Sequence, residues 1–422
     1  MPAAYHPSLR ANWAGDQPIS MLMSRALASP ELISLAAGFV DQQSLPARET
    51  EQALSDLFKS LSTARAALQY GTTSGYAPLR ELLLERTFKG QTERAARGSP
   101  TIDQVVLTAG SNQLLHLVLE SLADPGDIVL CAAPTYLVFL GTVANVGARS
   151  VGVATDSQGL IPEALEATLA QLEDAGELPR VRAIYLVNYF DNPCGITMPA
   201  DRVRRTIEIA KQWSRRGKIY VLADEAYREL RYAGDDVPSA MVLDEDHDTV
   251  LGVGTFSKSY SPGMRVGWGI LPAELVSPVC CQKGNIDFGS PNFNQHLMHR
   301  VLERGLFDEH VRRIRGSYRG KLQAMLSAAE AELGSVPGVT WEHPMGGLYV
   351  WVQLPEGVDA GPEGRLFDAA VRNGVLYVPG QYCYPSGGEP VRRNTLRLSF
   401  GVQTGERIQA GVAALARAIR EL

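Results

Sequence analysis

The chain has 422 residues, a length that fits two or three domains, and its 45% hydrophobic and 20% charged residues are typical of a globular protein with large buried cores. Its 40 Lys and Arg against 46 Asp and Glu leave a formal charge of −6, whereas a nucleic-acid-binding domain is normally basic. This negative charge argues against a nucleic-acid partner. No run of about 18 apolar residues occurs, so we expect no membrane span.

The N-terminus, MPAAYHPSLRANWAGDQ, lacks the apolar core of a secretory signal. The cysteines are odd in number and form no C-x-x-C pair, so we expect no disulfide framework and no metal site. A reducing cytoplasm is the location that this cysteine usage favours. The five are Cys131, Cys194, Cys280, Cys281 and Cys383.

In chain order, residues 21–29 predict a short helix, and ISLAAG follows at 33–38. Residues 47–66 and 76–88 have the apolar spacing of amphipathic helices. Between them LQYGTTSGYAP is rich in Gly, Ser and Thr and predicts a loop.

From residue 104 onward, short apolar runs alternate with helical stretches. This alternation predicts an α/β domain with a mostly parallel sheet covered by helices. The predicted strands are 104–110, 128–134, 183–190, 218–227, 249–257 and 265–271, and the helices include 112–122 and 200–217.

After residue 290 the pattern changes to a smaller α+β unit. A long helical region at 296–333 precedes strands at 347–355, 374–380 and 394–401 and a last helix at 405–422. We therefore expect a large domain at 45–290 and a small C-terminal domain at 291–422, which the segment 1–44 joins.

The turn TAGSNQ brings Ser111 and Asn112 from a strand to the start of a helix. Free N–H groups at a helix N-terminus favour an anion such as phosphate, although Ser111 could simply cap the helix. The chain contains no P-loop motif, and no G-x-G-x-x-G opens a helix after a strand.

Two further strand ends carry polar side chains. Asp224 and Tyr227 follow the run KIYVL, and Asn192 lies in the turn NYFDNPCG. Ligands in open α/β sheets bind outside the carboxyl ends of the strands. Loop capping, simple packing and an ordinary turn asparagine are the structural alternatives for the three.

The segment TFSKSYSPGMR places Lys258 between hydroxyls and an arginine, again at a strand end. Thr255, Ser257 and Arg265 can all donate to an anion. A partly desolvated lysine near a cation loses its proton more readily and can attack a carbonyl. The alternative is a solvated surface lysine.

In NTLRLSFG, Arg397 faces away from its two leucine neighbours. It lies either on a wet face or in a cleft, where its planar fork suits a carboxylate. Together these groups are what a pyridoxal phosphate enzyme requires: a lysine for the aldehyde, a carboxylate for the pyridinium nitrogen and donors for the phosphate.

With these motifs in this order, the sequence resembles the fold-type I, class I/II aminotransferases, most of all the branch with 2-aminoadipate and kynurenine aminotransferases. The resemblance covers nearly the whole chain. Its most specific motif is TFSKSYSPGMRVG, and ADEAYREL, LQYGTTSGYAPLR, NPCG and TLRLSF support it. It implies the PLP-dependent transferase fold of type I and the cofactor pyridoxal 5'-phosphate.

Position by position, the resemblance implies that Lys258 forms the Schiff base with the cofactor aldehyde and later moves protons. Asp224 would pair with the pyridine N–H, Tyr227 and Asn192 would bind the phenolic oxygen, and Tyr136 would stack on the ring. The groups around the phosphate would be Ser111, Asn112, Thr255, Ser257 and Arg265.

For the substrate, the resemblance implies that Arg397 clamps the α-carboxylate, with Asn192 and the Gly38 backbone beside it. Tyr70 would reach the phosphate of a neighbouring subunit, which implies a homodimer with shared active sites. Cys194 stands where the family has threonine, Thr255 replaces a serine, and Asn112 is shorter than the usual glutamine, so no required group is lost.

The resemblance predicts a ping-pong transaminase that moves the amino group of an L-amino acid to a 2-oxo acid such as 2-oxoglutarate. Aminoadipate-type members place an arginine in the N-terminal helix, where this chain has Met21, with Arg25 one turn later. This favours aromatic or aliphatic donors, with 2-aminoadipate as a further candidate. The alternatives are a β-lyase or decarboxylase on the same fold and, more remotely, an aminotransferase-like regulator, for which we find no basic helix-turn-helix segment.

Overall fold

The computed structural model describes residues 5–15, 18, 20–22, 24, 29, 31–89 and 99–422. At the centre of this described chain is a nine-stranded sheet with the order β14-β4-β3-β6-β7-β8-β9-β2, and β5 pairs with β4 at its side. Neighbouring strands are parallel from β14 to β8, whereas β9 is antiparallel to both β8 and β2. The strands are β2 (Val105–Thr108), β3 (Ile128–Ala133), β4 (Arg149–Asp156), β5 (Gly159–Leu160), β6 (Val181–Leu186), β7 (Tyr220–Asp224), β8 (Val250–Thr255), β9 (Gly267–Ile270) and β14 (Gly387–Gly388).

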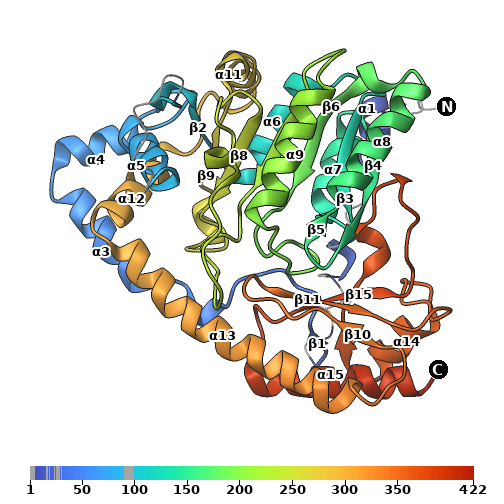
Figure 1. Ribbon diagram of the computed structural model, residues 1–422. Helices are drawn as coiled ribbons and strands as arrows, with labels where there is room; N and C mark the ends of the chain where they lie inside the picture. Colours follow the sequence, from blue (N-terminus) through green and yellow to red (C-terminus); the bar gives the residue numbers. More distant parts are fainter. Residues whose placement is uncertain are drawn as a thin grey trace.

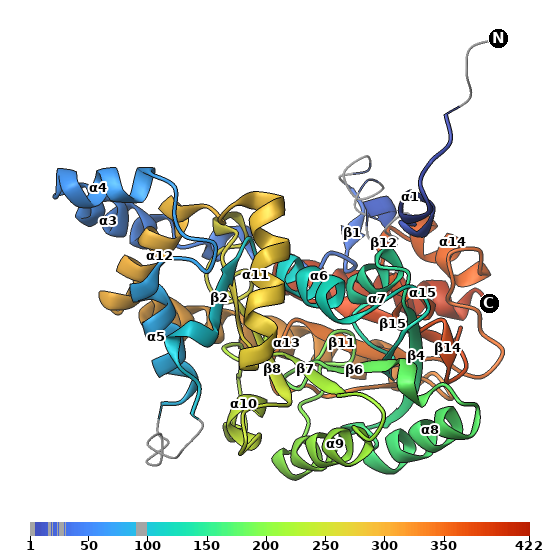
Figure 2. The same cartoon turned by 90° about the horizontal axis from the view of Figure 1, so that it is seen from above.

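Helices cover both faces of this sheet (Figure 2). One layer contains α6 (Ser111–Leu122), α7 (Leu137–Asn145) and α11 (Ala273–Asp287), and the other contains α8 (Pro162–Asp174), α9 (Ala200–Trp213) and α10 (Ala240–Leu243). Every residue of β2, β7 and β8 is buried, because a parallel sheet between two helical layers exposes neither face. The mostly parallel, helix-covered sheet predicted from the sequence is therefore confirmed.

Two predicted helical regions are each divided in the structure. The region 47–66 forms α3 (Ala47–Phe58) and α4 (Leu61–Leu68), and Ser60 caps α4 by accepting a hydrogen bond from the Thr63 N–H. The region 296–333 forms the end of α12 (Asn292–Glu303) and all of α13 (Leu306–Leu333). Gly305 separates them with a φ of 72°, which glycine adopts without strain. The predicted helix at 76–88 is α5 (Ala77–Thr87).

A second, four-stranded sheet has the order β10-β11-β15-β13 (Figure 1). Its strands are antiparallel where they pair: β10 (Thr340–Trp341), β11 (Tyr349–Gln353), β13 (Val378–Pro379) and β15 (Thr395–Ser399). It lies beside α14 (Arg365–Arg372) and α15 (Gly405–Arg420), and α13 crosses from the α3 end of the molecule to this sheet. The smaller α+β unit expected near the C-terminus is thus present.

The N-terminal segment pairs with this C-terminal part. β1 (Ile33–Ser34) is parallel to β12 (Val375–Leu376) in a sheet of two strands. The first helix, α1 (Leu9–Trp13), precedes it. Of the helix expected at 21–29, only residues 21, 22, 24 and 29 are described. Among the described residues, no helix combines the length and the apolar character that crossing a lipid bilayer requires.

The shared direction of β2, β6, β7 and β8 brings their carboxyl ends to one edge of the large sheet. β7 ends at Asp224 and β8 at Thr255, and the turn after β2 leads directly into α6. The loops that carry the predicted site residues therefore start at the same edge.

The same substitution is expected to have opposite effects at two glycines. An added Cβ at Gly254, in the buried β8, would overlap the Trp268 indole, so Gly254→Ala should destabilise the protein by about 1–3 kcal/mol. At Gly316, inside α13, a Cβ meets nothing within 4 Å, so Gly316→Ala should stabilise it by up to about 1 kcal/mol. Urea unfolding of the two variants beside the parent checks this, and equal midpoints would contradict it.

Candidate active site

A cavity of about 280 Å³ opens at the carboxyl ends of the strands. It collects most of the predicted site residues: Ser111, Asn112, Tyr136, Asn192, Asp224, Tyr227, Thr255, Ser257, Lys258 and Arg265. Phe39, Val187, Ala226 and Pro262 complete the wall. Residues from six separate stretches of the chain therefore meet around one space.

Lys258 is half-buried in the wall of this cavity and follows the buried Phe256 by two residues. Its Nζ donates a hydrogen bond of 2.9 Å to the Gly38 carbonyl and lies 5.9 Å from the centre of the Tyr227 ring. Lys258 forms none of the ion pairs found among the described residues, whereas surface lysines such as Lys211 and Lys218 do. Its amine is therefore directed into the site and is not neutralised by a carboxylate.

Arg265 packs against the turn that starts α6. Its Nη2 donates to the Ala109 carbonyl at 2.8 Å. Gly110, at the N-cap of α6, has a φ of 88°, and an added Cβ there would overlap the Arg265 guanidinium. Only glycine therefore lets the arginine lie beside the free N–H groups at the helix start, where both can attract an anion.

Two hydroxyls face the same end of the cavity. The Thr255 hydroxyl donates to Ser257 Oγ at 3.0 Å and accepts the Ser257 N–H at 3.1 Å. Arg265 Nη1 lies 3.5 Å from Ser257 Oγ. This cluster contains donors and a cation but no carboxylate, which is the composition that a phosphate ester requires.

Asp224 is almost fully buried, with 5% of its surface exposed. One carboxylate oxygen accepts the Tyr185 hydroxyl at 3.0 Å, and the other accepts the Ala226 N–H at 3.1 Å. Burial raises the pKa of Asp224 to about 6, while these two hydrogen bonds and the charge of Lys258 oppose the rise. The carboxylate is held rigidly and faces the cavity.

The aromatic hydroxyls of the site remain protonated donors. Burial raises the pKa of Tyr136 and of Tyr227 far above the ordinary value of a tyrosine. The Tyr227 hydroxyl lies 3.0 Å from that of Tyr349, and Asn112 hydrogen-bonds the Tyr136 hydroxyl.

Arg397 lies behind Asn192 and is 2% exposed. Its Nη1 donates to Asn192 Oδ1 at 2.7 Å and its Nη2 to the Ala36 carbonyl at 2.8 Å, while its guanidinium lies 4.3 Å from the Tyr349 ring centre. Its Nε has no partner among the described residues. A buried arginine without a carboxylate partner is suited to receive an anionic ligand.

The remaining predicted residues take different places. Gly38 contacts the site through its carbonyl, and an added Cβ there would collide with the Tyr349 hydroxyl. Tyr70 does not line the cavity; it is 82% exposed and packs edge-on against Phe288, with 5.6 Å between ring centres. Arg25 lies outside the described residues.

Tyr185 and Tyr349 contact the predicted site residues Asp224 and Tyr227, and the sequence did not reveal these contacts. Both lie inside apolar strand runs and are fully buried, so the sequence pattern does not distinguish them from ordinary core residues. The available signal was their position: Tyr185 stands next to the last residue of β6, one strand away from Asp224.

A larger cavity of about 490 Å³ lies beside α5, β8 and α13. Several of its charged groups pair with one another: Arg86 with Glu229 and Asp308, and Arg315 with Glu229. It contains neither Lys258 nor Asp224. Size alone therefore does not identify the site, and the smaller cavity holds the chemistry.

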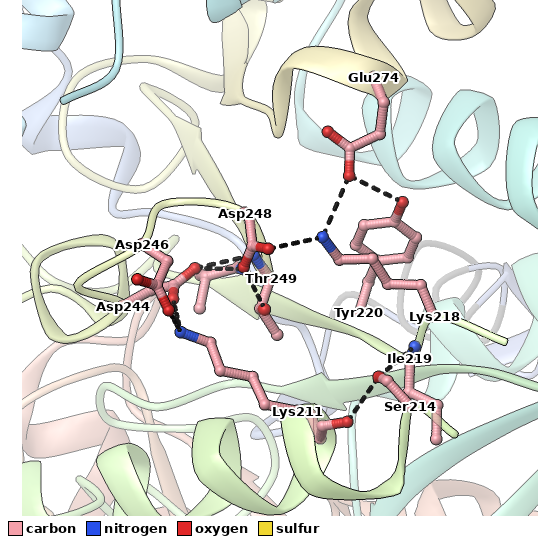
Figure 3. A network of polar contacts seen from close by, with 12 residues as sticks. Lys211, Ser214, Lys218, Ile219, Tyr220, Asp244, Asp246, Asp248, Thr249 and Glu274 are labelled. Atoms are coloured by element: carbon pink, nitrogen blue, oxygen red, sulfur yellow. Dashed lines mark hydrogen bonds and ion pairs between the residues drawn. The ribbon is translucent and has the colours of Figure 1, made fainter. Parts of the chain in front are cut away.

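A group of three aspartates near β8 is occupied by protein partners (Figure 3). Lys211 Nζ lies 2.7 Å from a carboxylate oxygen of both Asp244 and Asp246, and Lys218 pairs with Asp248 at 2.9 Å. Asp244 also accepts the N–H groups of residues 249 and 250. Their metal-like spacing is thus explained by a network that anchors the start of β8.

The donor set of the smaller cavity fits pyridoxal 5'-phosphate. The hydroxyls, Arg265 and the start of α6 form an anion cradle at one end, Asp224 offers a carboxylate, and Lys258 offers an amine. These are the groups that the phosphate, the ring nitrogen and the aldehyde need.

Comparison with known proteins points in the same direction. The family model described as "Aminotransferase class I and II" matches residues 30–415. An aromatic-amino-acid aminotransferase of Thermococcus litoralis is 34% identical over 94% of this chain and 90% of its own length. A 2-aminoadipate transaminase of Thermus thermophilus is 33% identical over 93% of this chain and 91% of its own length.

A solved structure has the same architecture. The kynurenine aminotransferase of Pyrococcus horikoshii, crystallised in complex with PMP, superposes with a TM-score of 0.89 at 32% identity, over 98% of this chain and 97% of that one.

Loss of the Arg265 charge is expected to weaken the binding of an anionic cofactor selectively. For Arg265→Met we predict that the affinity of the cofactor-free protein for pyridoxal phosphate falls by about 10–100-fold, because a charge-assisted hydrogen bond is lost. Its affinity for pyridoxal, which has no phosphate, should change little. Equilibrium titration with both compounds measures this, and an equal loss for both would contradict a role at the phosphate.

Proposed function

The chain belongs to the class I and II aminotransferases, and from this we propose that it transfers the amino group of an aromatic or aliphatic L-amino acid to a 2-oxo acid such as 2-oxoglutarate in a ping-pong reaction. The observation that supports the site most directly is that Lys258 and Asp224 line the same cavity as the cluster of Thr255, Ser257 and Arg265.

The protein is a transaminase of fold type I and depends on pyridoxal 5'-phosphate. When bound, this cofactor supplies an electron-withdrawing ring that stabilises the negative charge left on a substrate carbon after its proton is removed. The remaining steps belong to residues of the chain.

We assign the covalent attachment and the proton transfer to Lys258. Its Nζ bonds only a carbonyl oxygen, so the amine can leave Gly38 and take the α-proton of a bound amino acid. Asp224 holds the proton of the ring nitrogen, because its fixed carboxylate accepts hydrogen bonds and faces the cavity.

The residues that line the wall support the other cofactor contacts that we propose. Ser111, Asn112, Thr255, Ser257 and Arg265 would hold the phosphate. Tyr136 would pack on the ring, and the protonated hydroxyl of Tyr227, with the amide of Asn192, would donate to the ring oxygen.

We assign the substrate α-carboxylate to Arg397. Its Nε is unpaired, and Asn192 fixes the other side of the guanidinium, so an incoming carboxylate finds a preoriented cation. The Gly38 backbone lies next to this position through its contact with Lys258.

The preference for aromatic or aliphatic donors rests on the composition of the cavity. Among the described residues that line it, the cations are Lys258 and Arg265, which are already assigned to the aldehyde and the phosphate. Phe39 and Val187 provide apolar surface, and Met21 stands at the position where aminoadipate-type relatives have an arginine. The distal carboxylate of a 2-aminoadipate donor would find no further cation among these described lining residues.

A homodimer with shared sites is supported by exposed apolar side chains near α4. Leu61, Leu68 and Tyr70 are each more than 60% exposed, and Phe288 beside Tyr70 is 62% exposed. Large apolar side chains exposed on one part of a chain are typical of an interface. In a symmetric pair, Tyr70 would reach the phosphate of the other subunit.

The division into 1–44, 45–290 and 291–422 remains our proposal, supported by the two separate sheets and by the pairing of β1 with β12. A cytoplasmic location is proposed from the cysteine usage alone.

The donor preference is tested with amino acids offered against 2-oxoglutarate. We expect kcat/KM for phenylalanine or leucine to exceed that for 2-aminoadipate by at least about tenfold, because an unpaired buried carboxylate costs more than about 1.4 kcal/mol. Measured glutamate and 2-oxo acid should be equimolar. Release of ammonia with pyruvate, or of an amine with carbon dioxide, would instead identify a lyase or a decarboxylase. The control Lys258→Ala should lose at least about 10³-fold in rate, and Lys89→Ala, at an exposed lysine, should keep it.

The dimer proposal is tested by placing a charge on the apolar surface. Leu68→Glu should convert the protein from dimer to monomer in sedimentation and lower cofactor affinity, since a desolvated carboxylate at an interface is unfavourable. Leu9→Glu, at a leucine of similar exposure in α1, is the matched control and should leave both unchanged. A Leu68→Glu variant that stays dimeric would exclude this surface as the interface.

A further inference from the structure

Tyr185 makes a side-chain contact that the assigned roles do not explain. It lies on β6, directly beside β7, and its hydroxyl donates to Asp224 Oδ2 at 3.0 Å. The opposite oxygen of Asp224 accepts the Ala226 N–H at 3.1 Å. The carboxylate is thus held from both sides, by the backbone of its own loop and by a side chain from the neighbouring strand.

The Tyr185 ring is itself fixed in place. It is fully buried and stacks on Phe139, with 3.6 Å between ring centres and an angle of 16° between the planes. A stacked ring inside a sheet core has little freedom to rotate, so the hydroxyl is presented to Asp224 at a defined point.

We infer that Tyr185 is a positioning residue for Asp224, which fixes the orientation of that carboxylate and keeps it in the charged form that a pyridinium N–H requires. The inference rests on the proposed role of Asp224 at the ring nitrogen. Tyr185 is not among the residues that line the cavity, so it would act only through its neighbour.

The electrostatic surroundings explain why such a residue is needed. Burial is the main cause that raises the pKa of Asp224 to about 6, and the charge of the adjacent Glu225 contributes to this rise. Lys258 after β8 lowers this pKa, as do the Tyr185 hydroxyl and the Ala226 N–H. Without the hydroxyl, more of the carboxyl would be neutral near pH 7, and a neutral carboxyl is a poor acceptor for a ring N–H.

Tyr185 is suited to donate and not to compete for the proton. Burial, the Asp224 charge and the nearby hydroxyl of Tyr136 raise the pKa of Tyr185 well above the ordinary value, and the thiol of Cys131 faces it from β3. The tyrosine therefore stays protonated near neutral pH, and its single O–H is committed to Asp224.

The test compares Tyr185→Phe with the parent by titrating the cofactor-free protein with pyridoxal phosphate between about pH 5 and pH 9. The phenylalanine keeps the stack on Phe139 and removes only the hydroxyl. Since the hydrogen bond favours the charged form, the pKa of Asp224 rises when it is lost, and the pH below which affinity falls should move up by about one unit. The same shift should appear on the acid side of the kcat/KM profile.

Tyr377→Phe is the matched control. Tyr377 is also fully buried and donates to a carbonyl, that of Ala360, at 3.0 Å. Loss of the Tyr377 hydroxyl should lower stability without moving the acid limb, that is, the pH below which the affinity for pyridoxal phosphate falls. If Tyr185→Phe lowers stability in the same way and leaves the limb in place, Tyr185 is only a packing residue and the inference is wrong.

Two further variants distinguish a failure of the inference about Tyr185 from a failure of the proposed role of Asp224. Phe139→Leu keeps the hydroxyl but removes the stacked ring, and it should shift the limb in the same direction by less. Asp224→Asn should weaken pyridoxal phosphate binding across the whole pH range. If it does not, the assignment of Asp224 fails; if it does while Tyr185→Phe and Phe139→Leu leave the limb unmoved, only the inference about Tyr185 fails.

Discussion

The common direction of β6, β7 and β8 is the constraint on which the site depends. In a parallel sheet the carboxyl ends lie at one edge, so Asp224 at the end of β7 and Thr255 at the end of β8 are neighbours without any special loop. Reversal of β7 alone would move Asp224 to the opposite edge. The helical layers on both faces, which bury these strands completely, are what keeps this register unique.

Burial at this edge changes the chemistry of the groups placed there. Asp224 and Arg397 are charged residues with almost no exposure, and each is compensated by hydrogen bonds and not by an opposite charge in contact. A buried carboxylate and a buried guanidinium that are only hydrogen-bonded can still bind a ligand group of opposite charge. The unpaired Nε of Arg397 and the raised pKa of Asp224 are two expressions of the same arrangement.

The sequence predicted those features that depend on local order along the chain. The alternation of apolar runs and helices indicated the parallel sheet, and Asp224 and Lys258 could be recognised because one ends a buried strand and the other lies within three residues of the end of one. It missed the divisions at Ser60 and Gly305, since one capping residue inside a continuous periodic pattern barely changes the pattern. It also missed β14, whose two glycines pair with β4 from far along the chain.

Tyrosines within strands show why the rest could not be predicted. Tyr185 and Tyr349 occupy positions where a phenylalanine would satisfy the same periodicity, and only the three-dimensional neighbour of each hydroxyl gives it a role. For Tyr349 that neighbour is Tyr227, while its ring lies under Arg397 and its hydroxyl leaves no room for a side chain at Gly38. Tyr349, a residue of the C-terminal sheet, thus contacts the N-terminal segment, the loop after β7 and the buried arginine.

The N-terminal segment also contacts two side chains of the site. The carbonyls of Ala36 and Gly38 accept hydrogen bonds from Arg397 and Lys258, respectively. In the roles proposed for these two side chains, a substrate carboxylate and the cofactor aldehyde would compete with the N-terminal segment for them, which would couple the position of that segment to occupation of the site.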